Sequence, residues 1–199
     1  MHFRLPTLAL AAALLAPAAA HAQSGNFIFQ NDPEGRFTGG APVGKLYQRY
    51  GMSPVARSTV SFPSNEKAGT IIINTKERRL YYLLGDGRAI RYGIGVGRDG
   101  FTWGGVQTVT DKREWPSWTP PGEMLKRRPD LPRFMPGGPE NPLGARAMYL
   151  GSTLYRIHGS NEPETIGEAV SSGCFRMTNS DVIDLYARVK VGTKVVVLR

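Results

Sequence analysis

One cysteine and one histidine in the last third of the chain could together form a nucleophile and its base. Cys174 is the single cysteine among 199 residues and lies in the stretch VSSGCFRM. His158 lies sixteen residues earlier, in the stretch YRIHGS. A thiol beside an imidazole can pass its proton to the ring and attack a carbonyl carbon. The pair is therefore a candidate for a reactive, base-activated thiol.

The neighbours of Cys174 favour a reactive thiol. Ser171, Ser172 and Gly173 are small, so they leave a sulfur accessible and leave backbone N–H groups beside it. Arg176 brings a positive charge that favours the thiolate. One alternative is an inert core thiol, since unpaired cysteines are among the most buried residue types. Another is a disulfide between two molecules, which an odd cysteine in an exported protein also suggests. A structural hydrogen-bonding role is likewise the alternative for the histidine.

The N-terminus is typical of an export signal. A positive residue precedes an apolar run over residues 8–20, and a small-x-small triplet follows at 20–22. We expect a signal peptide over residues 1–22 and no membrane span, because thirteen apolar residues are too few to cross a bilayer as a helix. Both other histidines lie in this segment, so the mature chain has too few cysteine and histidine ligands for a structural zinc site. No metal and no cofactor are predicted.

Short strands and one helix are predicted around the pair. A capping box at Thr178 and Asp181 precedes a helical pattern that ends at Gly192. His158 would then end a strand, and Cys174 would lie on the loop before the helix. The strand-like stretches are 70–74, 80–84, 89–93, 147–150, 153–157 and 193–198.

The two motifs together resemble a known signature. IHGS followed by SSGCFRM is similar to the pattern of the YkuD-type L,D-transpeptidases, which is HG, a spacer, and S-x-G-C-[IV]-R-[ML]. The resemblance covers residues 68–199. Phe175 replaces the usual aliphatic residue, and Ser172 stands where many members have a second histidine.

The resemblance implies a mostly β fold, a bent sheet sandwich or barrel-like catalytic domain with short helices and a long cap loop. We assign the cap to residues 112–146, which hold eight prolines and cannot be regular throughout. The catalytic domain would span residues 68–199. Residues 23–67 have weak periodicity and form an expected N-terminal arm, for which a flexible spacer is the favoured interpretation.

The family also implies roles for the site residues. Cys174 would be the nucleophile and His158 the base, oriented by the main-chain carbonyl of Gly159. The backbone N–H groups of Gly173 and Cys174 would bind the oxyanion. Arg176 would hold a substrate carboxylate, with a structural ion pair as the alternative.

Three further residues are candidates for substrate binding. Ser171 and Ser172 flank the cysteine, and Trp118 lies in the expected cap. Trp118 and Trp115 would stack on sugar rings, or else pin the loop to the sheet.

The function implied is peptidoglycan remodelling in the bacterial periplasm. The third residue of a tetrapeptide stem would acylate the enzyme with release of D-alanine, and a neighbouring stem would resolve the thioester to a 3-3 cross-link. The alternatives are an L,D-carboxypeptidase, a ligase that joins an outer-membrane protein to the wall, and a non-catalytic wall-binding module.

The net charge of +9, with a basic cluster over residues 126–128 and Arg133, suits the carboxylates of stem peptides. A solvated basic face is the alternative. Nucleic acid is not an expected partner of an exported protein without a binding motif. Residues 95–100 match G-x-G-x-x-G, but no helix pattern follows, so we interpret these glycines as turn residues.

Overall fold

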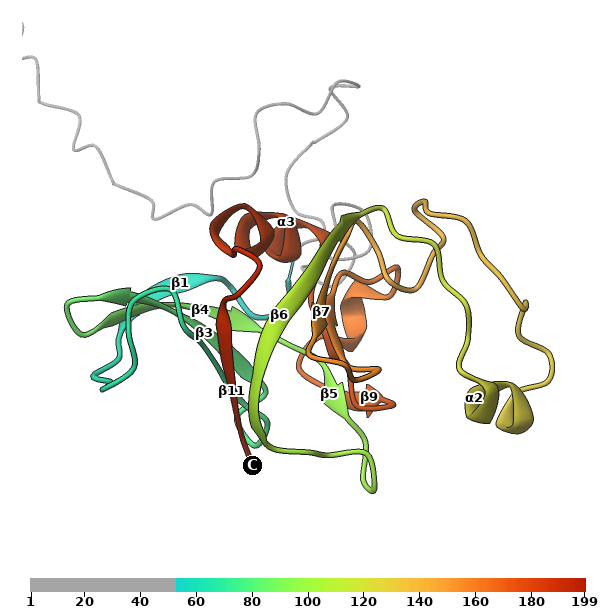
Figure 1. Ribbon diagram of the computed structural model, residues 1–199, viewed down its shortest axis with the longest axis horizontal. Helices are drawn as coiled ribbons and strands as arrows, with labels where there is room; N and C mark the ends of the chain where they lie inside the picture. Colours follow the sequence, from blue (N-terminus) through green and yellow to red (C-terminus); the bar gives the residue numbers. More distant parts are fainter. Residues whose placement is uncertain (1–52) are drawn as a thin grey trace, which may run out of the picture. The chain divides into compact units, whose positions relative to one another are not determined.

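The computed structural model describes residues 53–199, most of whose regular structure is β-strand (Figure 1). The predicted signal peptide and residues 23–52 of the predicted arm lie outside the described residues. The helices are α2 (Gly122–Arg127), the short 3-10 helix η1 (Pro163–Thr165) and α3 (Asn179–Arg188). The strands are β1 (Ser58–Ser61), β2 (Ile71–Asn74), β3 (Arg79–Gly85), β4 (Arg88–Gly93), β5 (Val96–Gly97), β6 (Gly105–Glu114), β7 (Arg146–Leu150), β8 (Arg156–His158), β9 (Ala169–Ser171), β10 (Phe175–Arg176) and β11 (Lys194–Leu198).

Nine strands form one mixed sheet in the order β1-β4-β3-β2-β11-β6-β7-β8-β10, and β5 pairs with β9 separately. The ten-residue strand β6 joins the two halves of the large sheet. Its first residues pair with β11, and after a register shift between Val109 and Asp111 the rest pairs with β7. Such irregularities bend a strand. The predicted mostly β fold with few short helices is confirmed.

The main core joins both halves of the sheet to α3. Val182 and Leu185 of this helix are fully buried against strand residues such as Ile73, Leu80 and Met148. Helix α3 begins where the capping box predicted, since the Thr178 side chain accepts a hydrogen bond from the backbone N–H three residues later. The helix therefore anchors the segment that follows Cys174.

The sheet begins inside the stretch that was expected to be a spacer. Strand β1 pairs antiparallel with β4, and Val60 packs on a second apolar cluster formed by β2, β3 and β4. A four-residue edge strand with one apolar side chain is too weak a pattern to distinguish from coil. No membrane-spanning candidate occurs among the helices of residues 53–199.

Strand β8 is shorter than predicted. Thr153 uses its hydroxyl in the turn, donating to the carbonyl of Leu150 at 2.6 Å and accepting from the backbone N–H of Tyr155 at 3.1 Å. The turn therefore extends further, and the strand begins only at Arg156. His158 is nevertheless its last residue, as the sequence predicted.

The expected cap is an irregular excursion between β6 and β7 that carries the exposed helix α2 (Figure 1). Paired backbone hydrogen bonds between Trp118 and Met135, both 2.8 Å, close its base. The cap is shorter than predicted at its start, because Lys112 to Glu114 continue β6.

The glycines of residues 95–100 form turn and strand, as interpreted from the sequence. Gly97 belongs to β5, and the backbone N–H of Phe101 donates to the carbonyl of Arg98 to close a turn. A Cβ atom on Gly97 would lie 2.5 Å from the carbonyl oxygen of Phe101, so the close backbone approach requires glycine. The next regular element is β6, a strand.

Candidate active site

The parallel pairing of β8 with β10 determines which side chains meet at the site. Phe175 lies opposite Ile157, and Arg176 lies opposite His158. Side chains alternate between the two faces of a sheet. Phe175 and Ile157 point into the core, where they are 1% and 0% exposed, so Arg176 and His158 point to the other face. Cys174 immediately precedes β10 and lies on that second face.

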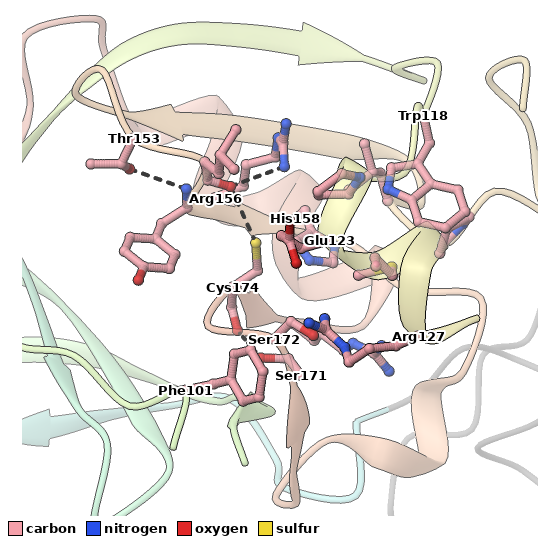
Figure 2. Close-up of a pocket in the computed structure, with 17 residues that line it drawn as sticks. Phe101, Trp118, Glu123, Arg127, Thr153, Arg156, His158, Ser171, Ser172 and Cys174 are labelled. Carbon is pink, nitrogen blue, oxygen red and sulfur yellow. Dashed lines mark hydrogen bonds between the residues drawn. The ribbon is translucent and has the colours of Figure 1, made fainter. Parts of the chain in front are cut away.

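A cavity of about 560 Å³ opens over this face. Its volume is in the range of small-molecule sites. In Figure 2 the sulfur of Cys174 points toward the side of the cavity that Arg156 and His158 occupy. The other lining groups include the aromatic side chains Phe101, Trp118 and Tyr155 and the charged side chains Glu123, Arg127 and Arg176.

His158 is held in one orientation and kept neutral. It is 5% exposed, and its Nδ1 lies 2.6 Å from the carbonyl oxygen of Gly159. A carbonyl only accepts, so Nδ1 carries the proton and Nε2 keeps a free lone pair. Burial lowers the pKa of His158 to about 3, helped by the charges of Arg176 and Arg156 and opposed by the hydrogen bond to Gly159. A neutral imidazole can accept a proton from a neighbouring thiol.

Cys174 is half-buried, with its Sγ atom 3.7 Å from the carbonyl oxygen of Leu154. Burial raises the pKa of the Cys174 thiol, while the charge of Arg156 and then that of Arg176 act to lower it. The thiol is therefore protonated at neutral pH and needs a base to become a nucleophile.

Ser171 lines the cavity, its hydroxyl is engaged by its own loop, and its predicted substrate role stays a prediction. It is 3% exposed, and its hydroxyl accepts from the N–H of Gly173 at 3.1 Å and donates to the carbonyl of Cys174 at 2.6 Å. Both contacts fasten the loop that carries the cysteine. Because the N–H of Gly173 is occupied, only one of the two predicted oxyanion donors, the N–H of Cys174, has no hydrogen-bond partner within residues 53–199.

Gly173 is required by both its conformation and its neighbours. Its φ angle is +106°, and a Cβ atom there would lie 2.5 Å from the ring of Tyr155. Trp103 stacks on that ring with centroids 4.5 Å apart and donates from Nε1 to the carbonyl of Gly173 at 2.8 Å. Trp103 was missed by sequence analysis, because no local pattern links it to a loop seventy residues away.

Arg176 forms the ion pair that was the alternative to its substrate role. Its Nη1 lies 2.8 Å from Oε2 of Glu162, which sequence analysis did not single out. Ser172 and Trp118 line both the main cavity and an adjoining cavity of about 440 Å³, so both are accessible to a ligand there. Their binding roles stay predictions.

Arg156 was also missed, although a signal was present. It lies two residues before His158 in the same strand, so the alternation of side chains places both on one face. The register adds that Arg156 precedes Ile157 as Cys174 precedes Phe175 in the parallel β8–β10 pair, and both residues line the cavity. No carboxylate within the described residues pairs with its guanidinium.

A comparison with known protein families shows to which family the chain belongs. The YkuD family, described as the L,D-transpeptidase catalytic domain, matches residues 68–197. The chain belongs to this L,D-transpeptidase family. A probable L,D-transpeptidase of Escherichia coli, ErfK/SrfK, is 42% identical over 137 residues, which cover 64% of this chain and 43% of that protein. The chain thus matches less than half the length of this curated relative.

Solved structures share the L,D-transpeptidase fold. L,D-transpeptidase 3 from Mycobacterium tuberculosis superposes with a TM-score of 0.55 at 17% identity, covering 66% of this chain and 61% of that one. A Brucella melitensis protein described as a probable carnitine operon oxidoreductase is 46% identical, with a TM-score of 0.50, over 76% of this chain and 98% of that one.

Proposed function

We propose that this protein is an exported cysteine transpeptidase that remodels peptidoglycan through a thioester on Cys174. One observation carries the proposal. A protonated thiol and a neutral imidazole with a free Nε2 lie on one face of a strand pair, above a cavity large enough for a peptide. Membership of the L,D-transpeptidase family supports the same chemistry.

The first half-reaction acylates the enzyme. Nε2 of His158 accepts the S–H proton, and the sulfur of Cys174 forms a bond to the carbonyl carbon of the third residue of a tetrapeptide stem. The oxyanion faces the N–H of Cys174, a kind of contact worth about 3 kcal/mol in other enzymes. The tetrahedral intermediate then breaks its C–N bond, and the amine of the terminal D-alanine leaves with the proton from His158.

The second half-reaction transfers the acyl group. An amine of a neighbouring stem attacks the thioester, gives a proton to His158, and forms a 3-3 cross-link, while the sulfur regains its proton. Water in place of the amine would make the protein an L,D-carboxypeptidase. An amine on an outer-membrane protein would make it a protein-to-wall ligase.

The charge of the cavity suits such substrates. Arginine side chains from the cap, from β8 and from β10 line it, and stem peptides carry carboxylates. The periplasm holds this substrate, which agrees with the predicted signal peptide. N-terminal sequencing of the exported protein should find Gln23 first, and Met1 on exported protein would contradict cleavage.

A redox function, suggested by the name of the Brucella relative, has no support at the glycine-rich segment. A dinucleotide fingerprint needs a helix directly after the glycines to hold the pyrophosphate. Here residues 95–100 lead through a turn into strand β6.

Incubation of purified protein with tetrapeptide muropeptides, followed by mass analysis, tests the proposal. A dimer lighter than two monomers by one D-alanine is the expected product. Tripeptide without dimer would show that water is the acceptor, and unchanged muropeptide with folded protein would favour the wall-binding module.

Two variants and a covalent probe test the assigned residues. Cys174→Ala and His158→Gln should both lack turnover while keeping the circular dichroism of the wild type. A carbapenem should add its mass once, on the peptide that contains Cys174, because a thiolate able to open an amide also opens a strained β-lactam. No adduct on the wild type would contradict an accessible nucleophile, and equal rates in wild type and His158→Gln would remove the histidine as base.

A further inference from the structure

Of the charged side chains that line the cavity, Glu123 and Arg176 are ion-paired, whereas Arg127 and Arg156 have no carboxylate partner within residues 53–199. Within the cavity, Glu123 pairs with Lys126 at 2.7 Å and Arg176 pairs with Glu162 at 2.8 Å. Arg127, from the cap, keeps its charge and stacks on the ring of Phe101, 5.4 Å from its centroid. The imidazole of the site is neutral.

Arg156 is the unpaired cation that shares a hydrogen-bond acceptor with the sulfur. Its Nη1 donates to the carbonyl of Leu154 at 3.0 Å, the same oxygen that lies 3.7 Å from the sulfur of Cys174. Its Nε is buried and has no hydrogen-bond partner in the structure. The guanidinium carbon lies 5.1 Å from the centroid of the Tyr149 ring. No carboxylate of residues 53–199 forms an ion pair with it.

An uncompensated guanidinium with a buried, unpaired donor is costly unless some state of the protein uses it. The first anion that the reaction creates on this face is the thiolate of Cys174, before the oxyanion of the tetrahedral intermediate forms. We propose that Arg156 is the counter-charge of that thiolate, a role that rests on the proposed function of Cys174 as nucleophile.

The proton balance of the site requires such a cation. When the S–H proton moves to Nε2 of His158, the resulting imidazolium is buried and disfavoured, and it soon gives up the proton to the leaving amine. Arg176 is neutralised by its carboxylate partner. Arg156 is therefore the fixed positive charge that faces the sulfur throughout. In agreement, the charge of Arg156 lowers the pKa of Cys174 more than that of Arg176 does.

The rate of alkylation of Cys174 by iodoacetamide, measured from pH 6 to 10, tests the proposal. The reagent is uncharged, so the profile reports the thiolate and not attraction of the reagent. Arg156→Gln keeps a donor for the carbonyl of Leu154 but removes the charge. Its apparent thiol pKa should rise by about one to two units. The rate at pH 7 should fall several-fold, since the more basic thiolate recovers part of the loss through nucleophilicity.

Three control variants separate charge from packing. Arg156→Lys keeps the charge and should keep most of the wild-type profile. Arg113 stacks on the ring of Tyr149 at 5.2 Å but is not among the residues that line the cavity, so Arg113→Met should leave the profile unchanged. Glu162→Gln removes the carboxylate of Arg176 and should lower the thiol pKa.

The titration profiles of these variants can overturn the assignment of Arg156 as counter-charge. An unchanged profile in folded Arg156→Gln overturns the proposal, as do equal shifts in the Gln and Lys variants or an equal shift in Arg113→Met. If Arg156→Gln is unfolded by circular dichroism, Arg156→Met is titrated in its place. The proposed function fails separately, by absence of any muropeptide or carbapenem reaction in wild-type protein.

Discussion

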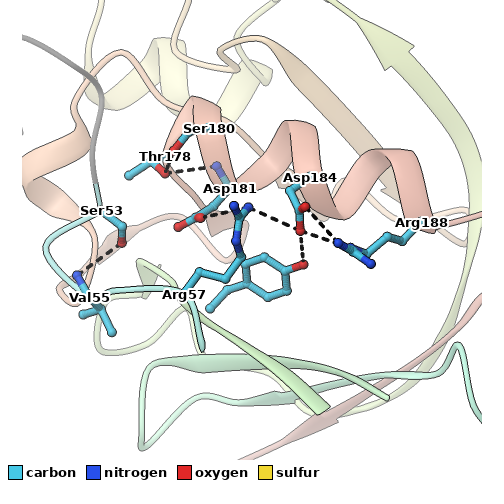
Figure 3. Close-up of polar contacts among 9 residues, drawn as sticks. Ser53, Val55, Arg57, Thr178, Ser180, Asp181, Asp184 and Arg188 are labelled. Atoms are coloured by element: carbon cyan, nitrogen blue, oxygen red, sulfur yellow. Dashed lines mark hydrogen bonds and ion pairs between the residues drawn. The ribbon is translucent and has the colours of Figure 1, made fainter. Parts of the chain in front are cut away.

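Two polar clusters in this protein use similar side chains in opposite ways. Arg57, just before β1, lies 3.6 Å from Asp181 and 3.3 Å from Asp184, which are both on α3. Arg188 lies 3.0 Å from Asp184, which also accepts a hydrogen bond from the hydroxyl of Tyr92 at 2.6 Å. Figure 3 shows the two arginines on either side of Asp184. The charges of this cluster cancel.

The cavity cluster leaves its charge uncancelled. Arg156 has no carboxylate partner within the described residues, and the groups that face it, His158 and Cys174, are both neutral before reaction. The α3 cluster ties the segment before β1 to the helix and so contributes to stability. The cavity cluster keeps an unpaired positive charge, that of Arg156, where the thiolate of Cys174 is to form. Matched variants in the two clusters should therefore separate stability from chemistry.

The largest effect is expected from Gly173→Ala in the cavity cluster. The added Cβ meets the ring of Tyr155 at 2.5 Å in a left-handed conformation, so the loop must move and displace Cys174. A displacement of about 1 Å can cost a hundredfold in rate, and we expect a loss of at least about that size in carbapenem acylation. Gly100→Ala is the control, because its φ is +81° but nothing lies within 4 Å. Equal losses in both would attribute the effect to backbone strain alone.

The neutral histidine should make stability depend on pH. The folded pKa of His158, about 3, lies below the unfolded value of 6.5, so the unfolded chain binds the proton first. The stability is complete above pH 6.5 and is lost as the pH falls toward 3. Between pH 7 and pH 5 the free energy of unfolding should fall by about 2 kcal/mol. The full slope of about 1.4 kcal/mol per pH unit is reached only below the unfolded pKa. Urea unfolding should show this extra slope in wild type and not in His158→Gln; parallel slopes would contradict a buried neutral imidazole.

The sequence predicts local features of both clusters well and their long-range partners poorly. Thr178 as helix cap, His158 at a strand end and Cys174 before α3 all follow from patterns a few residues long. Glu162, as partner of Arg176, depends on a loop whose course no periodicity describes.

The register between paired strands is the second feature that the sequence does not predict. The alternation in one strand places Arg156 beside His158, but only the pairing of β8 with β10 places it level with Cys174. Arg57 is a similar case, since it lies in a segment without a clear pattern and meets α3 more than a hundred residues later. Such contacts arise from tertiary packing, which a single sequence does not encode in its periodicity.

The α3 cluster should respond in stability alone. Arg57→Met leaves Asp181 and Asp184 without their shared cation, and burial already raises the pKa of Asp181. Because Arg57 is 40% exposed, solvent screening reduces the loss to about 1 to 2 kcal/mol. Alkylation of Cys174 should not change. Arg88→Met, which breaks an exposed pair with Asp86, is the control and should leave unfolding unchanged.

The smallest effect should come from an uncharged side chain of the cap that lines the cavity. Trp118 lines both cavities, so Trp118→Leu removes aromatic surface that a substrate would cover. The KM for muropeptide should rise about fivefold, while kcat and the iodoacetamide profile stay as in wild type. Trp115 is 44% exposed and lines neither cavity, so Trp115→Leu should change none of the three. An altered iodoacetamide profile in Trp118→Leu would show that the cap also shapes the charge environment of Cys174, and the division between binding and activation would then fail.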